Sequence, residues 1–165
     1  MKKTLIIFSV ALMFCACQKD FSLWREKNEE WLKDKVSYIN NLPDSIESGV
    51  SASGLQYEIF HRGFGEVPKS TSYVTVKYTG WLIDSTQFET STGTTFIVGN
   101  VIKGWQEILC KSHKNAHFKI HVPYDLAYGK DGSKSNNHFR IPPYSTLIFD
   151  IEILEVYQNS PADLN

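Results

Sequence analysis

The sequence predicts an α+β domain in which an antiparallel sheet packs one face on a single short helix. Short runs that alternate apolar and polar residues begin after Gly54, which is typical of half-buried strands. They lie at residues 55–59, 73–78, 96–98, 118–122 and 147–156. Within this region, helical spacing occurs at Trp105, Ile108 and Leu109, about two turns after Gly104. Half-polar strands around one helix favour an antiparallel sheet with one covered face.

Composition limits both the number of domains and the class of partner. The chain has 165 residues, of which 42% are hydrophobic, enough for one core of ordinary size. Its 17 basic and 18 acidic residues give a formal charge of -1. No dense basic stripe interrupts this balance, so we expect no nucleic-acid partner.

The first residues are typical of a targeting signal. Lys2 and Lys3 precede an apolar run at residues 5–14. This run is too short to cross a bilayer core of about 30 Å but suits the apolar part of a signal peptide. Ala16 followed by Cys17 resembles a bacterial lipoprotein signal, so we expect residues 1–16 to be removed and Cys17 to be lipidated. A plain secretory signal, with Cys17 as an ordinary thiol, is the alternative.

The lipoprotein interpretation predicts a location in the bacterial cell envelope. The protein would be membrane-anchored through its lipid and exposed to the periplasm or the cell surface. Cys15 would be removed with the signal, leaving Cys110 as the remaining thiol. Because an unpaired thiol in an exported protein implies burial or reactivity, and Ile108 and Leu109 precede it, we expect Cys110 to be buried.

Between the anchor and the domain, the pattern predicts an amphipathic helix. Its apolar stripe consists of Phe21, Trp24, Trp31, Leu32, Val36 and Ile39. A stretch rich in Ser, Gly and Asp at residues 44–54 is typical of a linker. The two tryptophans have three possible partners: their own domain, a second copy of the chain, or a membrane surface. The sequence leaves the oligomeric state open.

Four stretches within residues 50–157 carry a resemblance to a known family. They are 74–80 with Leu82 and Asp84, 88–91, 99–105, and 127–129 followed by 141–147 and 149–150. In this order they resemble the FKBP-type peptidyl-prolyl cis-trans isomerases. The resemblance implies an FKBP-like half-barrel sheet wrapped on one short helix, preceded here by the amphipathic helix. We therefore divide the chain into a signal peptide (1–16), an anchor segment with helix and linker (17–49), the isomerase domain (50–157) and a tail (158–165).

The resemblance also implies a shallow apolar pocket between sheet and helix. Trp105 would form its floor, Tyr128 would point its hydroxyl at a substrate carbonyl, and Glu89 would stand where the family has an Asp. These three would be the catalytic residues. The substrate-binding walls would be Tyr78, Phe88, Val101, Ile102, Ile141 and Phe149.

Such a pocket would suit the rotation of X-Pro bonds in proline-containing clients. Rotation must break amide resonance, a barrier of about 18–20 kcal/mol, and only X-Pro bonds populate both isomers well. No bond is made or broken, so we expect neither cofactor nor metal. The twisted amide is less strongly solvated than the planar form, so a dry apolar pocket favours it.

Several positions depart from the family pattern. Thr94 stands where an aromatic is usual, two residues before Phe96, and Ser112 replaces a usual Met. These changes support an alternative function, that of a catalytically weak or inactive peptide-binding or chaperone module of the envelope.

The loop between Tyr128 and Ile141 is longer and more polar than in compact members of the family. It carries Lys130, Lys134, His138 and Arg140. We therefore predict a preference for proline peptides with an acidic flank.

Three histidines recur at every fourth position, at 113, 117 and 121. The alternation of residues 118–122 places His117, Lys119 and His121 on one face of a strand. We expect these histidines to face solvent and to bind no metal.

Overall fold

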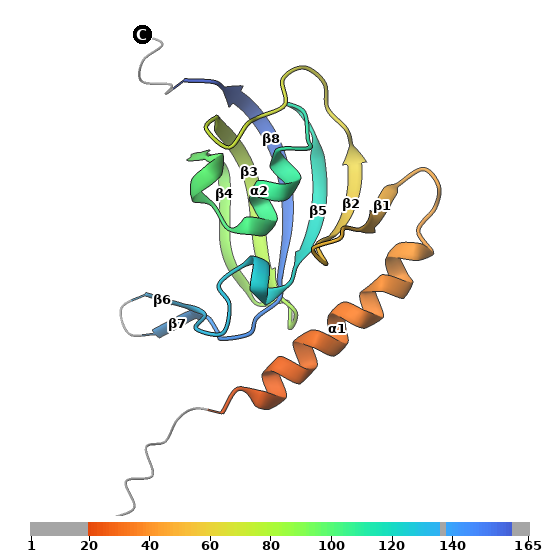
Figure 1. The fold of residues 1–165 in the computed structure, drawn as a ribbon, viewed down its shortest axis with the longest axis vertical. Helices are drawn as coiled ribbons and strands as arrows, with labels where there is room; N and C mark the ends of the chain where they lie inside the picture. Colours follow the sequence, from red (N-terminus) through yellow and green to blue (C-terminus); the bar gives the residue numbers. More distant parts are fainter. Residues whose placement is uncertain (1–19, 136–137, 160–165) are drawn as a thin grey trace, which may run out of the picture.

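The computed structural model describes residues 20–135 and 138–159 (Figure 1). The expected signal peptide and Cys17 lie outside the described residues. The helices are α1 (Ser22–Asn40), α2 (Lys103–Leu109), and the 3-10 helices η1 (Val98–Asn100) and η2 (Tyr124–Leu126). The strands are β1 (Glu47–Val50), β2 (Gln56–His61), β3 (Tyr73–Leu82), β4 (Gln87–Ile97), β5 (His117–Val122), β6 (Ser133–Ser135), β7 (His138–Ile141) and β8 (Leu147–Tyr157).

Six strands form one antiparallel sheet in the order β1-β2-β5-β8-β3-β4. The helix α2 lies across one face of this sheet, and β6 and β7 form a separate hairpin near one end (Figure 1). The predicted α+β class, with an antiparallel sheet packed on a short helix, is confirmed. The helix α2 begins at Lys103, two residues before the start that was expected after Gly104.

The core lies between the sheet and α2. Alternate residues of β3, β5 and β8 point inward and are buried, as period-two alternation requires. A bulge in β8 pairs Thr75 with Glu155 and Val76 with Ile153, which leaves Leu154 as an extra residue. Because the bulge shifts the alternation by one, Val156 is also buried.

Gly104 allows α2 to approach the sheet closely. A Cβ at this position would lie 2.5 Å from Cγ1 of Val122, inside van der Waals contact. The next residue, Trp105, therefore enters the space between helix and sheet with only 4% of its surface exposed.

The helix α1 lies beside β1 and β2 (Figure 1), and it contacts the outward-facing residues of β2 and β5. The Trp24 indole N–H donates to Oγ of Ser145 at 3.0 Å, and Nε2 of Gln56 donates to the Leu32 carbonyl at 2.7 Å. The Trp31 ring meets His121 edge-on, with ring centroids 5.1 Å apart. Of the three partners considered for the tryptophan stripe, the structure shows its own domain.

Docking of α1 overturns the expectation that His121 faces solvent. His121 is 3% exposed, although it shares its strand face with the half-buried His117. The alternation was interpreted correctly, but it cannot reveal a helix that covers the outward face. The cover also buries Gln56 and Glu58 of β2.

Two further expectations are wrong. Residues 44–54 are not a linker throughout, because Glu47–Val50 form β1 and pair with β2 along one sheet edge. Cys110 is exposed, not buried, because it caps the C-terminal end of α2 on the side away from the core.

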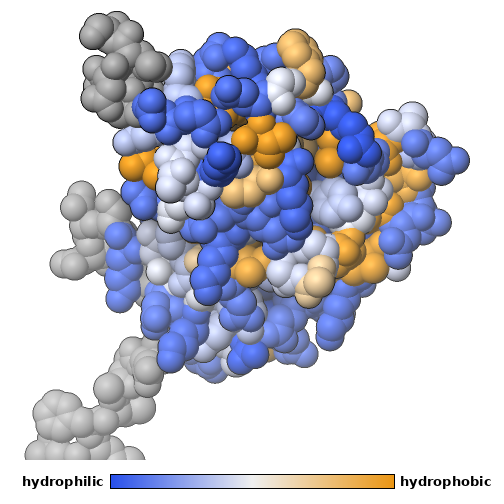
Figure 2. All heavy atoms as spheres, turned by 45° about the horizontal axis from the view of Figure 1, so that its top comes forward, coloured by the Kyte–Doolittle hydropathy of each residue, from blue (hydrophilic) through white to orange (hydrophobic). Residues whose placement is uncertain are grey.

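The surface facing the viewer in Figure 2 is mostly hydrophilic, with hydrophobic residues in separate patches. The large hydrophobic residues that are exposed are dispersed along the chain, from Leu23 in α1 to Tyr128 after η2. Within residues 20–135 and 138–159, no helix is both long and apolar enough to span a bilayer.

Candidate active site

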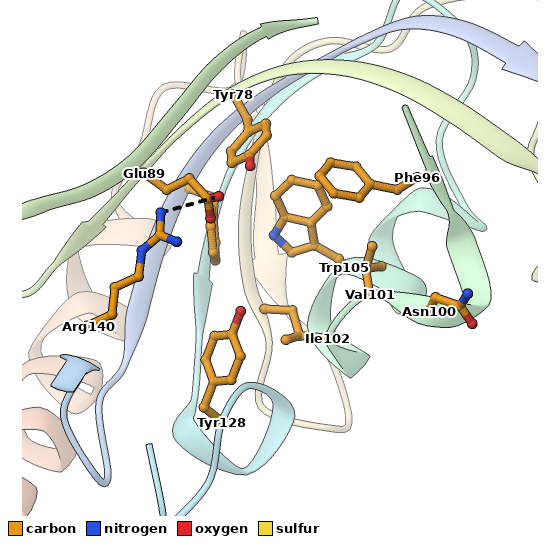
Figure 3. A pocket seen from close by; sticks show the side chains of 10 residues that line it. Tyr78, Glu89, Phe96, Asn100, Val101, Ile102, Trp105, Tyr128 and Arg140 are labelled. Carbon is orange, nitrogen blue, oxygen red and sulfur yellow. Dashed lines mark ion pairs between the residues drawn. The ribbon is translucent and has the colours of Figure 1, made fainter. Parts of the chain in front are cut away.

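A pocket of about 330 Å³ opens between α2, β3, β4 and the segment that follows η2 (Figure 3). Its lining residues are Tyr78, Glu89, Phe96, Asn100, Val101, Ile102, Trp105, Tyr128, Arg140 and Phe149. It brings together seven of the nine residues expected at the site, contributed by elements far apart in sequence.

Trp105 forms an aromatic floor that its neighbours hold in place. Tyr78, Phe96 and Phe149 meet the indole nearly perpendicularly, with centroids 5.0, 5.9 and 5.1 Å away. Edge-to-face packing of this kind is the favoured arrangement of aromatic pairs. The buried indole N–H has no acceptor among the described residues, so it is an unused donor at the floor.

Phe88 and Ile141 do not line this pocket. Phe88 packs edge-on against Phe149, with centroids 5.6 Å apart, and Ile141 is a core residue with 3% exposure. Phe88 reaches Phe149 over Gly80, where a Cβ would lie 2.7 Å from the Phe88 ring. Phe88 therefore supports the Phe149 wall from behind, and Ile141 belongs to the core.

The loop that carries Val101 and Ile102 is fixed by α2. Nε2 of Gln106 donates to the carbonyls of Val101 at 2.7 Å and Gly99 at 3.2 Å. This contact sets the wall opposite the sheet.

The remaining side of the pocket is polar. Tyr78 and Tyr128 direct their hydroxyls inward, and Glu89 pairs with Arg140 across the mouth at 3.4 Å (Figure 3). Burial, followed by the charge of Glu89, raises the pKa of Tyr78 to about 12. The same causes raise the pKa of Tyr128. Both hydroxyls therefore keep their protons at neutral pH and serve as hydrogen-bond donors.

Phe96, Asn100 and Arg140 line the pocket without having been expected there. Phe96 had a sequence signal, since it begins an apolar run that precedes the Gly99 loop. Arg140 was expected as one of the cations between Tyr128 and Ile141, but its place in the pocket lining was not. Asn100 had no such signal, because a polar residue between elements does not indicate which side chains it will meet.

The arrangement can hold an apolar ring over the indole and offer hydroxyl donors beside it. Among the residues that the structure describes, no group of three or more His, Cys, Asp or Glu side chains is placed to hold a metal ion.

Comparison with known proteins identifies the family. The family model of the FKBP-type peptidyl-prolyl cis-trans isomerases matches residues 65–154. The chain belongs to this FKBP family.

FKBP relatives from bacteria extend the match over most of the chain. The FKBP-type 22 kDa peptidyl-prolyl cis-trans isomerase of Escherichia coli K12 is 35% identical over 138 residues, covering 80% of this chain and 64% of the relative. FkpA from the same strain is 41% identical over 123 residues, which cover 71% of this chain and 44% of FkpA. An FK506-binding protein of Neisseria meningitidis serogroup B is 37% identical over 111 residues, which cover 64% of this chain and 98% of that protein. The chain thus spans about half to two thirds of the length of the first two relatives.

Solved FKBP structures share the fold. The crystal structure of FkpA from Escherichia coli superposes with a TM-score of 0.69 at 35% identity, covering 82% of this chain and 63% of that one. The structure of a peptidyl-prolyl cis-trans isomerase from Pseudomonas syringae superposes with a TM-score of 0.67 at 28% identity. The match covers 81% of this chain and 96% of that one.

Proposed function

We propose that the domain is a peptidyl-prolyl cis-trans isomerase that rotates X-Pro bonds of exported polypeptides in a desolvated apolar pocket. The observation that carries this proposal is the Trp105 floor, framed by three aromatic edges and faced by the Tyr128 hydroxyl. Isomerases of the FKBP family act on proline-containing polypeptides, and no cofactor is needed for a reaction that only turns a bond.

In the proposed mechanism, the proline ring lies on the indole of Trp105 while the preceding residue turns. The pocket excludes water from the twisted amide, which has lost charge separation between N and O and depends less on solvation. Tyr128 donates its hydroxyl to a substrate carbonyl and holds that carbonyl in place during rotation. An acceleration of about 10⁴ to 10⁶ requires roughly 5–8 kcal/mol of differential stabilisation.

Glu89 and Tyr78 form the polar end of the proposed site. The Tyr78 hydroxyl stands beside Glu89, and burial and the Glu89 charge raise its pKa to about 12, which keeps it protonated. Val101, Ile102 and Phe149 enclose the apolar end, and Phe88 supports Phe149 from behind.

A protease-coupled assay on a proline peptide tests this function. The wild-type chain is expected to accelerate isomerisation, and Tyr128→Phe is expected to lower kcat/KM by about 2- to 12-fold, the value of one net hydrogen bond. No rate above background for the wild type would refute the enzyme.

The alternative is a binding module with little turnover, and it is favoured by Thr94. This residue is half-buried and hydrogen-bonded to Oγ of Ser91 at 2.6 Å, so the strand is polar where an aromatic wall is usual. Peptide binding without turnover, measured by titration beside the same assay, would support this alternative.

We also propose that the chain is lipid-anchored through Cys17 in the bacterial cell envelope, on the strength of the Ala16-Cys17 signal. Mass spectrometry of the protein expressed in bacteria is expected to find an acylated N-terminal Cys17. Cys17→Ser should abolish the acylation, and an unmodified N-terminus in the wild type would contradict the anchor.

A further inference from the structure

Arg140 lies on β7 and lines the mouth of the pocket. The described residues 129–135 and 138–140 are here called the flap. The guanidinium donates two N–H groups to the Phe88 carbonyl of β4, from Nη2 at 3.1 Å and Nε at 3.4 Å. These bonds hold the group in one place although Arg140 lies on the exposed surface. A guanidinium anchored on one edge is preorganised to receive a carboxylate on another.

The pairing of Arg140 with Glu89 is loose enough to be exchanged. Nη2 of Arg140 lies 3.4 Å from Oε1 of Glu89, longer than the 2.7–2.9 Å typical of a tight charge-assisted bond. The two side chains are 47% and 37% exposed, and ion pairs of this exposure contribute little. The contacts of the guanidinium are made by Nε and Nη2, and among the described residues none accepts a hydrogen bond from Nη1.

Among the described residues that line the pocket, Arg140 and Glu89 carry charge. In sequence, the flap has Lys130, Lys134 and Arg140 against the single acid Asp131, so its overall charge favours an anion. Glu89 opposes them from β4, but it is already engaged by Arg140 and by the Tyr78 hydroxyl. A cation on the substrate would have to compete for Glu89 with a guanidinium that Phe88 holds in place.

We infer that Arg140 determines substrate specificity, by binding the carboxylate of an acidic residue that precedes the proline. This inference rests on the proposed isomerase function, and it assigns the predicted acidic preference to one contact. Nη1 of Arg140 donates to the substrate carboxylate while the Phe88 carbonyl keeps the guanidinium at the mouth.

The test measures kcat/KM of the full chain on three peptides that differ only in having Glu, Gln or Lys before proline. The wild type is expected to prefer Glu over Lys by about two- to five-fold, as one partly exposed ion pair allows. Arg140→Gln should reduce this ratio to one or below, because it removes the cation and leaves Glu89 unopposed. Turnover of the Gln peptide shows that the proposed function persists. Absence of turnover on all peptides would refute the isomerase itself, and the same ratio would then be measured as peptide affinities.

Two further variants distinguish a direct contact of Arg140 with the substrate from a general effect of positive charge on the flap. Lys130→Gln removes a cation from the flap outside the pocket lining and should leave the Glu/Lys ratio nearly unchanged. Glu89→Gln removes the competing carboxylate and should raise the ratio. The assignment to Arg140 would be overturned if Arg140→Gln kept the wild-type Glu/Lys ratio. It would also be overturned if Lys130→Gln lowered the ratio as much as Arg140→Gln does, or if Glu89→Gln lowered the ratio.

Discussion

At the scale of single residues, the site depends on how closely aromatic rings approach one another. Trp105 is fixed by three perpendicular neighbours, and Phe149, one of these, is fixed in turn by Phe88. The last contact exists because Gly80 has no side chain. Gly80 of β3 therefore controls the shape of a pocket that it does not line.

Gly80→Ala is expected to destabilise the domain by about 1–3 kcal/mol, the usual cost of overpacking. The new Cβ would lie 2.7 Å from Phe88 and 2.9 Å from Phe149, so both rings must move. Thermal or denaturant unfolding measures the change.

Gly93→Ala is the matched control for this substitution. Gly93 lies on β4, where a Cβ would be 3.8 Å from the nearest atom of Leu154, an ordinary contact. Equal stability losses in the two variants would contradict the role given to Gly80.

At the scale of elements, α1 is joined to the sheet by buried polar contacts as well as by its tryptophans. Asn28 is fully buried; its Oδ1 accepts the Thr146 backbone N–H at 2.8 Å, and its Nδ2 donates to the Trp24 carbonyl at 2.7 Å. This one side chain links the helix to the start of β8.

Asn28→Ala should lower the free energy of unfolding by about 1–3 kcal/mol, because it leaves the buried Thr146 N–H without an acceptor. The control is Asn40→Ala, an exposed asparagine at the end of the same helix. If Asn28→Ala proved as stable as Asn40→Ala, the docking of α1 described here would be wrong.

The His121 site under α1 predicts a dependence of stability on pH. Burial, helped by the charges of Lys35 and Lys119, lowers the pKa of His121 to about 4. The unfolded chain, with an ordinary histidine pKa of about 6.5, then binds more protons than the folded one between these values. The stability that neutral His121 contributes is therefore complete above about pH 6.5 and is lost as the pH falls toward 4.

The free energy of unfolding is expected to change by at most about 1.4 kcal/mol per pH unit. The Glu58 carboxylate, which lies 3.8 Å from the imidazole, reduces this slope. Urea unfolding at several pH values measures it. His121→Gln should flatten the profile. A wild-type profile without slope in this range would contradict the prediction.

At the scale of the whole molecule, local patterns predicted the elements but not all of their contacts. Alternation identified β3, β5 and β8, and the spacing of Trp105, Ile108 and Leu109 identified α2, because each depends on periodicity along a single segment. The burial of His121 was missed, since it depends on a helix about ninety residues away. The short polar strand β1 was missed because its pairing with β2, not its composition, makes it a strand.

The same distinction applies to the site. Trp105 and Tyr128 were expected from the family resemblance, and the structure brings them together in one pocket. Arg140 was predicted only as one of several loop cations, since its contacts with Phe88 and Glu89 span about fifty residues of sequence.

The most direct test of the proposed isomerase is exchange NMR spectroscopy of a proline peptide, which observes cis and trans signals without a protease. The full chain is expected to accelerate exchange, and Trp105→Leu to reduce that acceleration at least about tenfold, about 1.4 kcal/mol of lost transition-state stabilisation. Trp81→Leu, a tryptophan of β3 outside the pocket lining, should remain close to the wild type. Equal exchange with Trp105→Leu and the wild type, or no acceleration by the wild type, would contradict an isomerase site built on Trp105.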